Sequence, residues 1–405
     1  MSAARGAPDA GPLDHTLHVV GELTDDLLHA AESLFQLPER ASSPWHRAGL
    51  GTRGERVFNV AAGIVMTLLA SGWTYTIATT DTDAGPEASA ASVAVASALT
   101  DPDAPSTAFL ADAALAAFTP PRGTSGKLRA ELRVPGQALD VDSVPAGAQV
   151  ALAPAGTAAP DTSAVVAPDT ARSGVWSLAL RIGDAVRPVA DFNVINMLPF
   201  SAKRRGRIGG YLIGSWPTER RPSSNEHYNP PPGFIEVTPE NQNTQLSDHF
   251  RLRDFLTHDQ QDVWPKYLVI DTKLIDKLEL VLTDLQDHGV RTSGVHVMSG
   301  FRSPQYNAGG GDPTGRAALS RHMYGDAADI FIDNDGNGNM DDLNHDGRVN
   351  IRDAEVIEAA VERVERAYPA LVGGCGAYVG NGAHGPFTHI DTRGYRARWL
   401  GTGDG

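Results

Sequence analysis

Three residues in the last third of this 405-residue chain have the types and spacing of a zinc site. His322 and Asp329 lie in the run SRHMYGDAAD, residues 320–329, and His389 lies in FTHID. Histidine nitrogen and aspartate oxygen are both common zinc donors. Gly325 allows a turn between the first two, so a loop histidine and an aspartate that opens a strand can converge on one ion. Three protein ligands leave the fourth position to water, as in catalytic rather than structural zinc sites.

These segments resemble those of a known family. SRHMYGDAAD matches the S-x-H-x-x-G-x-A-x-D signature of the zinc D-alanyl-D-alanine carboxypeptidase superfamily, which includes the vancomycin-resistance dipeptidases and the hedgehog signalling domains. Residues 298–303, MSGFRS, resemble the S-G-[YF]-R-S segment of that family, and FTHIDTRGYRARW resembles its closing H-x-D segment. The three segments occur in the order found in the family, and the resemblance covers residues 233–401.

The resemblance implies a role for each motif residue. It makes His322, Asp329 and His389 the ligands of one catalytic Zn²⁺. It places Arg302 against the substrate carbonyl or carboxylate, where the guanidinium would stabilise the negative charge that develops as water attacks. It makes Ser320 a hydrogen-bond partner of the substrate backbone. The alternatives are a structural salt bridge for Arg302 and a turn-stabilising hydroxyl for Ser320.

The chain departs from the family at the general base. Several members carry a glutamate three residues before the last zinc histidine, and that position is Pro386 here. Phe387 also excludes the variant with a histidine two residues before. The remaining candidates are His384 and Asp391, of which we prefer Asp391 because it lies on the same strand face as His389. If neither serves, the site is a binding site rather than a working hydrolase.

A calcium-binding loop is predicted directly after the strand that carries Asp329. Residues 333–353 read DNDGNGNMDDLNHDGRVNIRD, with Asp and Asn at short, regular spacing. Oxygen ligands suit a hard cation, so we expect one or two structural Ca²⁺ ions that stiffen the zinc site; the alternative is a solvated acidic loop. One dockerin-like register has its ligands at Asp342, Asn344, Asp346, the carbonyl of Arg348, Asn350 and Asp353, and an overlapping register has Asp333, Asp335, Asn337 and Asp341.

The elements that must position these residues mix helices and strands. Because they show no βαβ regularity, we predict an α+β domain over residues 233–401. The resemblance implies that this is a peptidase domain with a mixed or antiparallel sheet of the carboxypeptidase or hedgehog kind. The apolar residues between 274 and 285 recur at helical spacing, and Gly289 sits where a helix C-cap belongs. Further predicted elements are strands at 295–298, 329–332 and 387–391 and a helix at 353–368.

Three segments are expected before this domain. Residues 127–200 contain the alternating runs LRAELRV, AQVALAP, GVWSLALRI and RPVADFNV, which predict a small all-β module without a catalytic constellation. Residues 201–232 are a basic, proline-rich linker. Residues 81–126 are rich in Ala, Pro, Thr and Asp, a composition typical of a flexible linker.

An N-terminal transmembrane helix is predicted at residues 57–80. This stretch contains no charged residue and is long enough to cross a bilayer. Arginines precede it and acidic residues follow it, so the positive-inside rule makes residues 1–56 a cytoplasmic tail and places the rest outside the membrane. The alternatives are a buried core helix, because Asn59 and several Thr and Gly residues dilute the hydrophobicity, and a signal peptide cleaved near residues 88–92.

The bulk composition limits the classes of partner. A net charge of −15 and a pI of 5.3 argue against a nucleic-acid binder. Cys375 is the only cysteine, so an intramolecular disulfide is excluded. We interpret it as a small packing residue.

Together these patterns predict a cell-envelope hydrolase anchored in the inner membrane through residues 57–80, with its C-terminal domain in the periplasm. It would be a zinc metallopeptidase with an EF-hand-like calcium loop. Its substrates would be peptidoglycan stem or cross-link peptides, and both D-alanine carboxypeptidase and endopeptidase action are open. The alternative is a non-catalytic cell-wall-binding module with structural zinc and calcium.

Overall fold

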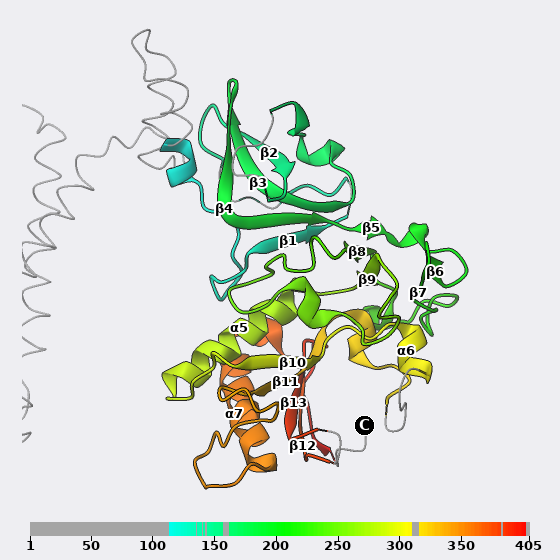
Figure 1. The fold of residues 1–405 in the computed structure, drawn as a ribbon, viewed down its shortest axis with the longest axis vertical. Coiled ribbons are helices and arrows are strands. Elements are labelled where there is room, and N and C mark those ends of the chain that lie inside the picture. The colour runs from blue at the N-terminus through cyan, green and yellow to red at the C-terminus, as the bar shows by residue number, and fades with distance from the viewer. Residues whose placement is uncertain are drawn as a thin grey trace, which may run out of the picture. The chain divides into compact units, whose positions relative to one another are not determined.

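The structure, a computed structural model, describes residues 113–134, 136–139, 141, 144–156, 162–309, 316–381 and 384–401 (Figure 1). All of these belong to one compact unit. They form mixed sheets and few helices. The short 3-10 helices among them are η2 (Thr162–Ala164), η3 (Pro168–Thr170), η4 (Phe200–Ala202), η5 (Glu226–Tyr228), η6 (Leu252–Phe255), η7 (Arg321–Tyr324) and η8 (Pro369–Leu371).

A four-stranded sheet comes first in the chain, and its strands occupy the four alternating runs of residues 127–200. Its spatial order is β1-β4-β3-β2, with β1 parallel to β4 and the other pairs antiparallel. Leu178, Leu180 and Phe192 fill its core, and Ala114 and Phe118 from the expected linker are buried in the same cluster. The bounds are β1 (Ala130–Arg133), β2 (Gln149–Pro154), β3 (Gly174–Ile182) and β4 (Ala185–Asn196).

Residues 198–268 are folded rather than extended. β5 (Leu198–Pro199), β8 (Gly233–Val237) and β9 (Lys266–Leu268) form a three-stranded sheet, and β6 (Arg207–Ile208) and β7 (Tyr211–Leu212) form a hairpin. Apolar side chains from the expected proline-rich linker enter the main core, so this segment is part of the domain. They are Ile208, Tyr211, Ile213 and Trp216.

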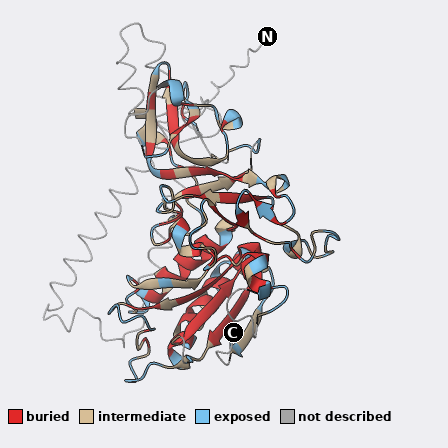
Figure 2. Cartoon of the chain, turned by 45° about the vertical axis from the view of Figure 1, so that its right-hand side comes forward, coloured by how far each residue is buried: buried red, intermediate tan, exposed pale blue. Residues whose placement is uncertain are grey.

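The largest sheet has five strands in the order β10-β11-β13-β12-β14. Only the β12–β14 pair is parallel. Helix α7 packs on β12 and β13, and helix α5 packs on α7; the strands beneath them are mostly buried (Figure 2). The bounds are β10 (Val295–Ser299), β11 (Ala327–Ile332), β12 (Gly374–Tyr378), β13 (Phe387–Asp391), β14 (Ala397–Gly401), α5 (Thr272–Asp287), α6 (Pro304–Gly309) and α7 (Ile351–Ala367).

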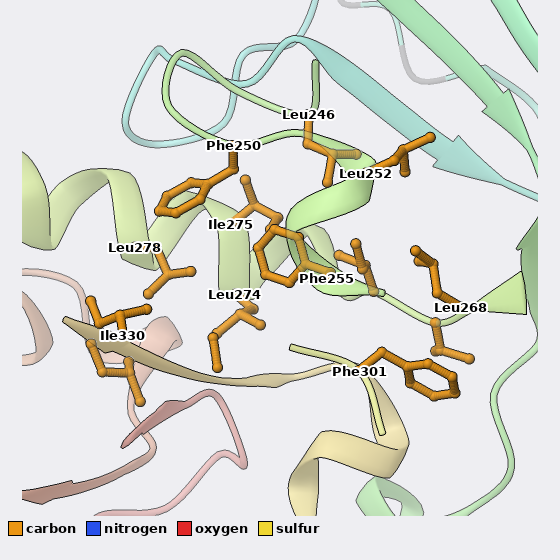
Figure 3. Packing of buried hydrophobic residues seen from close by; sticks show 14 of the residues in the cluster. Leu246, Phe250, Leu252, Phe255, Leu268, Leu274, Ile275, Leu278, Phe301 and Ile330 are labelled. Carbon is orange, nitrogen blue, oxygen red and sulfur yellow. The ribbon is translucent and has the colours of Figure 1, made fainter. Parts of the chain in front are cut away.

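Helix α5 anchors the core with an apolar face. It begins at Asp271, whose side chain accepts a hydrogen bond from the Lys273 N–H, and Gly289 with φ of +85° follows its end. Leu274, Ile275 and Leu278 are buried beside Phe250, Phe255 and Ile330 (Figure 3). Burial of each such side chain contributes about 1.5–3 kcal/mol to folding.

The same helix also buries charged residues, each with a partner from another part of the chain. Asp276 accepts hydrogen bonds from the backbone N–H groups of Thr124 and Ser125, at 2.8 Å each. Lys277 is fully buried and donates to Glu365 Oε1 at 2.6 Å and to the Asp391 carbonyl at 2.7 Å. Because an unpaired buried charge is costly, these contacts fix where α5 lies against the sheet.

The prediction of a transmembrane helix is not supported. Residues 57–80 lie outside the described residues, and no helix in the described part of the chain is long and apolar enough to cross a bilayer. Its longest helices, α5 with 16 residues and α7 with 17, carry charged side chains and fall short of the ~20 apolar residues that a span requires. The predicted N-terminal membrane anchor, and the periplasmic location inferred from it, are therefore not supported.

Replacing Gly325 with alanine should destabilise the domain more than the same change at Gly289. Both have positive φ, +75° and +85°, but a Cβ at Gly325 would collide with the Val269 carbonyl, whereas Gly289 faces open space. We expect a loss of about 1 kcal/mol for Gly289→Ala, and about 3 kcal/mol or more for Gly325→Ala. Urea denaturation measures both, and equal losses would contradict the close packing at Gly325.

Candidate metal centre

Two of the three predicted ligands come from neighbouring strands. In the β11–β13 pairing Asp329 lies directly opposite His389, and cross-strand neighbours of this kind have adjacent side chains. Thr388 Oγ1 donates to the Ala354 carbonyl of α7, so the Thr388 side chain points toward the helix. Because side chains alternate along a strand, His389 points to the opposite face of the sheet.

The third ligand, His322, lies on η7. This turn ends at Gly325, whose left-handed conformation lets the chain reverse into β11. The Arg321 guanidinium pairs with the Asp326 carboxylate, and both side chains are buried. The loop is therefore held on both sides of His322, and the Trp216 indole also donates to the Met323 carbonyl at 2.9 Å.

The three side chains converge on one point. His389 Nδ1 lies 2.8 Å from Asp329 Oδ1, and His322 Nε2 lies 3.2 Å from both of these atoms. All three residues are buried, and their ligand atoms lie within 4.8 Å of one another. Two imidazole nitrogens and one carboxylate oxygen form the donor set of an open zinc site, so the residues fit the ion that the sequence predicted.

Each histidine is oriented through its second ring nitrogen. His322 Nδ1 lies 2.7 Å from the Gly300 carbonyl, and His389 Nε2 lies 3.1 Å from Asp391 Oδ2. An N–H at each of these positions would donate outward and leave a lone pair on the nitrogen that faces the other ligands. Such outer contacts fix the tautomer and ring orientation of metal-binding histidines.

The shared carboxylate separates the pKa values of the two histidines. Burial lowers the pKa of His322 to about 4, with the nearby Arg302 charge acting in the same direction. Burial also lowers the pKa of His389, but its hydrogen bonds to Asp329 and Asp391 outweigh this effect and raise it to about 9. Burial raises the pKa of Asp329, yet the charges of His322 and Arg302 hold it well below the usual range. Without a metal, the proton therefore resides on His389.

The three ligands open into a cavity of about 630 Å³. Its volume lies within the range of small-ligand sites. Aromatic rings form part of the wall: Tyr378 stacks on Phe387 at 4.4 Å between centroids, and Trp399 lies 5.2 Å from the His389 ring. The charged lining residues are mostly cationic, namely Arg302, Arg316, Arg321 and Arg393, with Asp329 as the carboxylate among the described lining residues.

Arg302 and Ser320 both line this cavity. Arg302 donates to Asp329 Oδ2 at 2.6 Å and to Ser299 Oγ at 2.8 Å. The guanidinium therefore forms the salt bridge that was the structural alternative, and also faces the cavity beside the ligand set. Ser320 precedes η7 and is buried, and its side chain makes no capping bond to the turn.

The two residues considered as general base do not line the cavity. Asp391 is fully buried, and its carboxylate accepts hydrogen bonds from the Arg393 side chain and the Gly374 N–H as well as contacting His389. Burial raises the pKa of Asp391, but His389 and Arg393 more than reverse this and keep it ionised. His384 Nδ1 contacts the Gly385 carbonyl instead. This geometry suits Asp391 to orienting His389 rather than to taking a proton from water.

Arg393 and Trp399 are site residues that the sequence reasoning did not single out. Arg393 pairs with Asp391 and lies over the Trp399 ring at 5.4 Å. Gly376 lies opposite His389 on β12, and a Cβ there would collide with the Trp399 indole, so glycine admits this ring. The available signal was the RGYRARW sequence that follows the last histidine.

The acidic loop brings three of its predicted calcium ligands together. Asp333, Asp335 and Asp341 place carboxylate oxygens within 4.8 Å of one another. Asp333 also accepts hydrogen bonds from the N–H groups of Gly336, Asn337 and Gly338, which wraps the loop around it.

The second register is arranged differently. Asp342, Asp346 and Asp353 are not grouped in this way among the described residues. Asp353 Oδ1 accepts from the Leu343 and Asn344 N–H groups and its Oδ2 from the Asn350 N–H. These bonds fix the loop to the start of α7. The remaining predicted calcium ligands lie in the same loop segments; they are Asn337, Asn344, Asn350 and the Arg348 carbonyl.

Comparison of the chain with family models, curated proteins and solved structures finds no match. The resemblance to the zinc carboxypeptidases therefore rests on the three motifs.

Zinc binding should strengthen as the pH rises toward about 9. A metal ion requires an unprotonated His389 Nδ1, and with a pKa of about 9 this histidine is charged at neutral pH. His322, with a pKa of about 4, is already neutral. Affinity should rise about tenfold per pH unit between pH 6.5 and 8.5. Calorimetry at pH 7 in buffers of different protonation enthalpy should show release of about one proton, and a pH-independent affinity would contradict this assignment.

Calcium should stabilise the folded protein through the Asp333 group. A 100-fold excess of Ca²⁺ over its dissociation constant should add about 2.7 kcal/mol to the unfolding free energy. Asp333→Asn should remove most of the calcium-dependent rise in Tm. Asp342→Asn, a matched change in the other register, should remove less of it. An unchanged wild-type Tm on adding Ca²⁺ and on chelation would rule out this role.

Proposed function

We propose that this chain is a zinc-dependent peptidase that hydrolyses peptidoglycan stem or cross-link peptides. The observation that carries the proposal is the convergence of two histidine nitrogens and one aspartate oxygen at a cavity beside an arginine. The three motifs that resemble the D-alanyl-D-alanine carboxypeptidases supply the substrate class. Both carboxypeptidase and endopeptidase action fit this proposal.

His322, Asp329 and His389 would hold the ion. Zinc at such a site supplies a Lewis acid and lowers the pKa of bound water toward neutrality. Gly300 and Asp391 keep the two imidazoles aligned through their outer nitrogens. Asp391 is in turn held by Arg393, which limits the movement of His389. These contacts fix the orientation of the ligand side chains.

Arg302 is the residue best placed to act on the substrate. Its guanidinium has five N–H donors in a planar fork, and its hydrogen bonds to Asp329 and Ser299 use two of its three nitrogens. It can therefore hold Asp329 and still direct a donor toward a substrate carbonyl or carboxylate in the cavity. Stabilising negative charge that develops there would lower the barrier to hydrolysis. Ser320 lines the same wall and would hydrogen-bond the peptide backbone.

A non-catalytic wall-binding module with structural zinc and calcium is the second candidate. It is favoured by one observation: the described residues that line the cavity include no carboxylate apart from the ligand Asp329. Pro386 occupies the position at which several family members carry a glutamate. Calcium at the Asp333 group would have a structural role in either case, because this loop directly follows β11.

The decisive experiment is digestion of purified peptidoglycan by the full chain, loaded with zinc and calcium, with analysis of the released muropeptides. The wild type should release peptide fragments, and His322→Ala should lose both zinc and activity. His288→Ala is the matched control, because His288 is an exposed histidine at the end of α5. Bound zinc without any cleavage would refute the peptidase and favour the binding module.

A second variant separates the two roles considered for Asp391. Asp391→Asn should weaken zinc binding about 10–100-fold if the carboxylate orients His389. Activity should then recover when excess zinc saturates the site. If Asp391 were the general base, activity would stay low with zinc fully bound.

A further inference from the structure

Five exposed arginines lie in the turn that leads into β6, on β6 itself and in the turn that follows β7. They are Arg204, Arg205, Arg207, Arg220 and Arg221. We refer to them as the arginine surface. Residues 201–221 contain six basic residues and one acidic residue, in a chain whose net charge is −15. The net charge of this segment is therefore positive, whereas that of the whole chain is negative.

The fold brings the two groups of arginines together. Arg204 and Arg207 are paired across the turn that leads into β6, through backbone hydrogen bonds of 2.8 and 2.9 Å, and Arg205 lies in the turn between them. Lys203 is buried, and its ammonium pairs with Glu219 Oε2 at 2.5 Å. This ion pair joins the residue before Arg204 to the residue before Arg220. It also neutralises the Glu219 carboxylate, while the nearby Asp259 carboxylate accepts from the Tyr211 hydroxyl on β7.

The arginine surface is fixed to the elements of the metal centre. The Trp216 indole donates to the Met323 carbonyl of η7, next to His322. The Gln305 N–H of α6 donates to the Ile213 carbonyl at 3.1 Å, and a Cβ at Gly214 would lie 2.6 Å from Gln305 N. In Figure 1 the hairpin accordingly lies beside α6. These contacts hold the arginine surface in a fixed position relative to η7 and α6.

The same segment reaches the wall of the cavity. The Thr218 hydroxyl donates to the Tyr228 carbonyl, and Tyr228 lines the cavity. Thr218 stands two residues before Arg220. Four arginines line the cavity, and three of them are paired with aspartates: Arg302 with Asp329, Arg321 with Asp326 and Arg393 with Asp391.

We propose that the arginine surface binds a polymer with closely repeated anionic groups and thereby presents its attached peptides to the metal centre. Guanidinium groups bind carboxylates and phosphates through paired N–H donors, and several such contacts along one polymer add to its affinity. The shared chemistry is a repeated carboxylate or phosphodiester on a glycan. Binding of the polymer does not depend on the proposed function. Only the presentation of its peptides to the metal centre rests on that function.

The test measures binding of the full chain to insoluble cell wall, which requires no catalysis. The variant carries Arg204→Gln, Arg205→Gln, Arg220→Gln and Arg221→Gln. Arg207 is retained because it lies in strand β6 and donates to the Gly210 carbonyl of the hairpin turn, whereas Arg204 donates only within the turn before β6. The matched control carries Arg172→Gln, Arg253→Gln, Arg291→Gln and Arg366→Gln, four exposed arginines elsewhere. We expect the first variant to bind about tenfold or more weakly than the wild type, with a shallower salt dependence. Equal losses in both variants, at equal Tm, would overturn the proposal.

Two further arms identify the ligand. Walls from which the phosphodiester polymers have been extracted with acid should lose binding if phosphate is the ligand, and keep it if carboxylates are. Preference for double-stranded DNA over both wall preparations would refute a wall polymer. Hydrolysis of a soluble peptide should be unaffected by the four substitutions. If the wild type binds the wall through these arginines but cleaves nothing, the peptidase fails and the binding surface stands.

Discussion

The register between β11 and β13 is the constraint on which the rest of the site depends. It sets Asp329 opposite His389, and the ligand oxygen of the former lies 2.8 Å from the ligand nitrogen of the latter. A shift of one residue would turn one of these side chains to the helix-covered face of the sheet. Apolar residues on that face, such as Ile330 and Ile390, hold the register because they are buried under the helices. The core thereby fixes the position of polar groups that do not themselves belong to it.

Buried ionic contacts complete what the apolar core begins. Lys277 on α5 holds the end of β13 through the Asp391 carbonyl, and Glu365 on α7 accepts from Lys277 and from Arg398. Removing one partner of such a network leaves a buried charge uncompensated, which costs about 3–5 kcal/mol. The strand that carries His389 is therefore fixed by directional contacts from two helices. These contacts hold His389 in place beside the cavity.

Much of the site could be predicted from sequence because its signals are local. The spacing of His322, Gly325 and Asp329 defines a turn followed by a strand, and the strand period places Asp391 on the face of His389. What could not be predicted is which imidazole nitrogen faces the other donors, because that depends on Gly300 and Asp391 in three dimensions. Sequence alone therefore offered Asp391 as a base, whereas its contacts suit it to orienting His389.

The charged residues of α5 and the packing of residues 201–232 depend on distant partners, and local composition does not reveal them. The apolar stretch of residues 57–80 is likewise compatible with a bilayer or with a protein core, and its hydropathy does not distinguish the two environments.

The separation of the ligands along the chain also determines when the site can exist. His322 and His389 are 67 residues apart, and Trp399, which lies against His389, comes from β14, the last strand described. During synthesis the first two ligands emerge from the ribosome well before the third, so a nascent chain displays an incomplete, low-affinity set. Capture of the proposed ion would therefore follow the addition of β13, among the last events of folding. A polypeptide truncated before β13 would lack the middle strand of the five-stranded sheet together with the third donor.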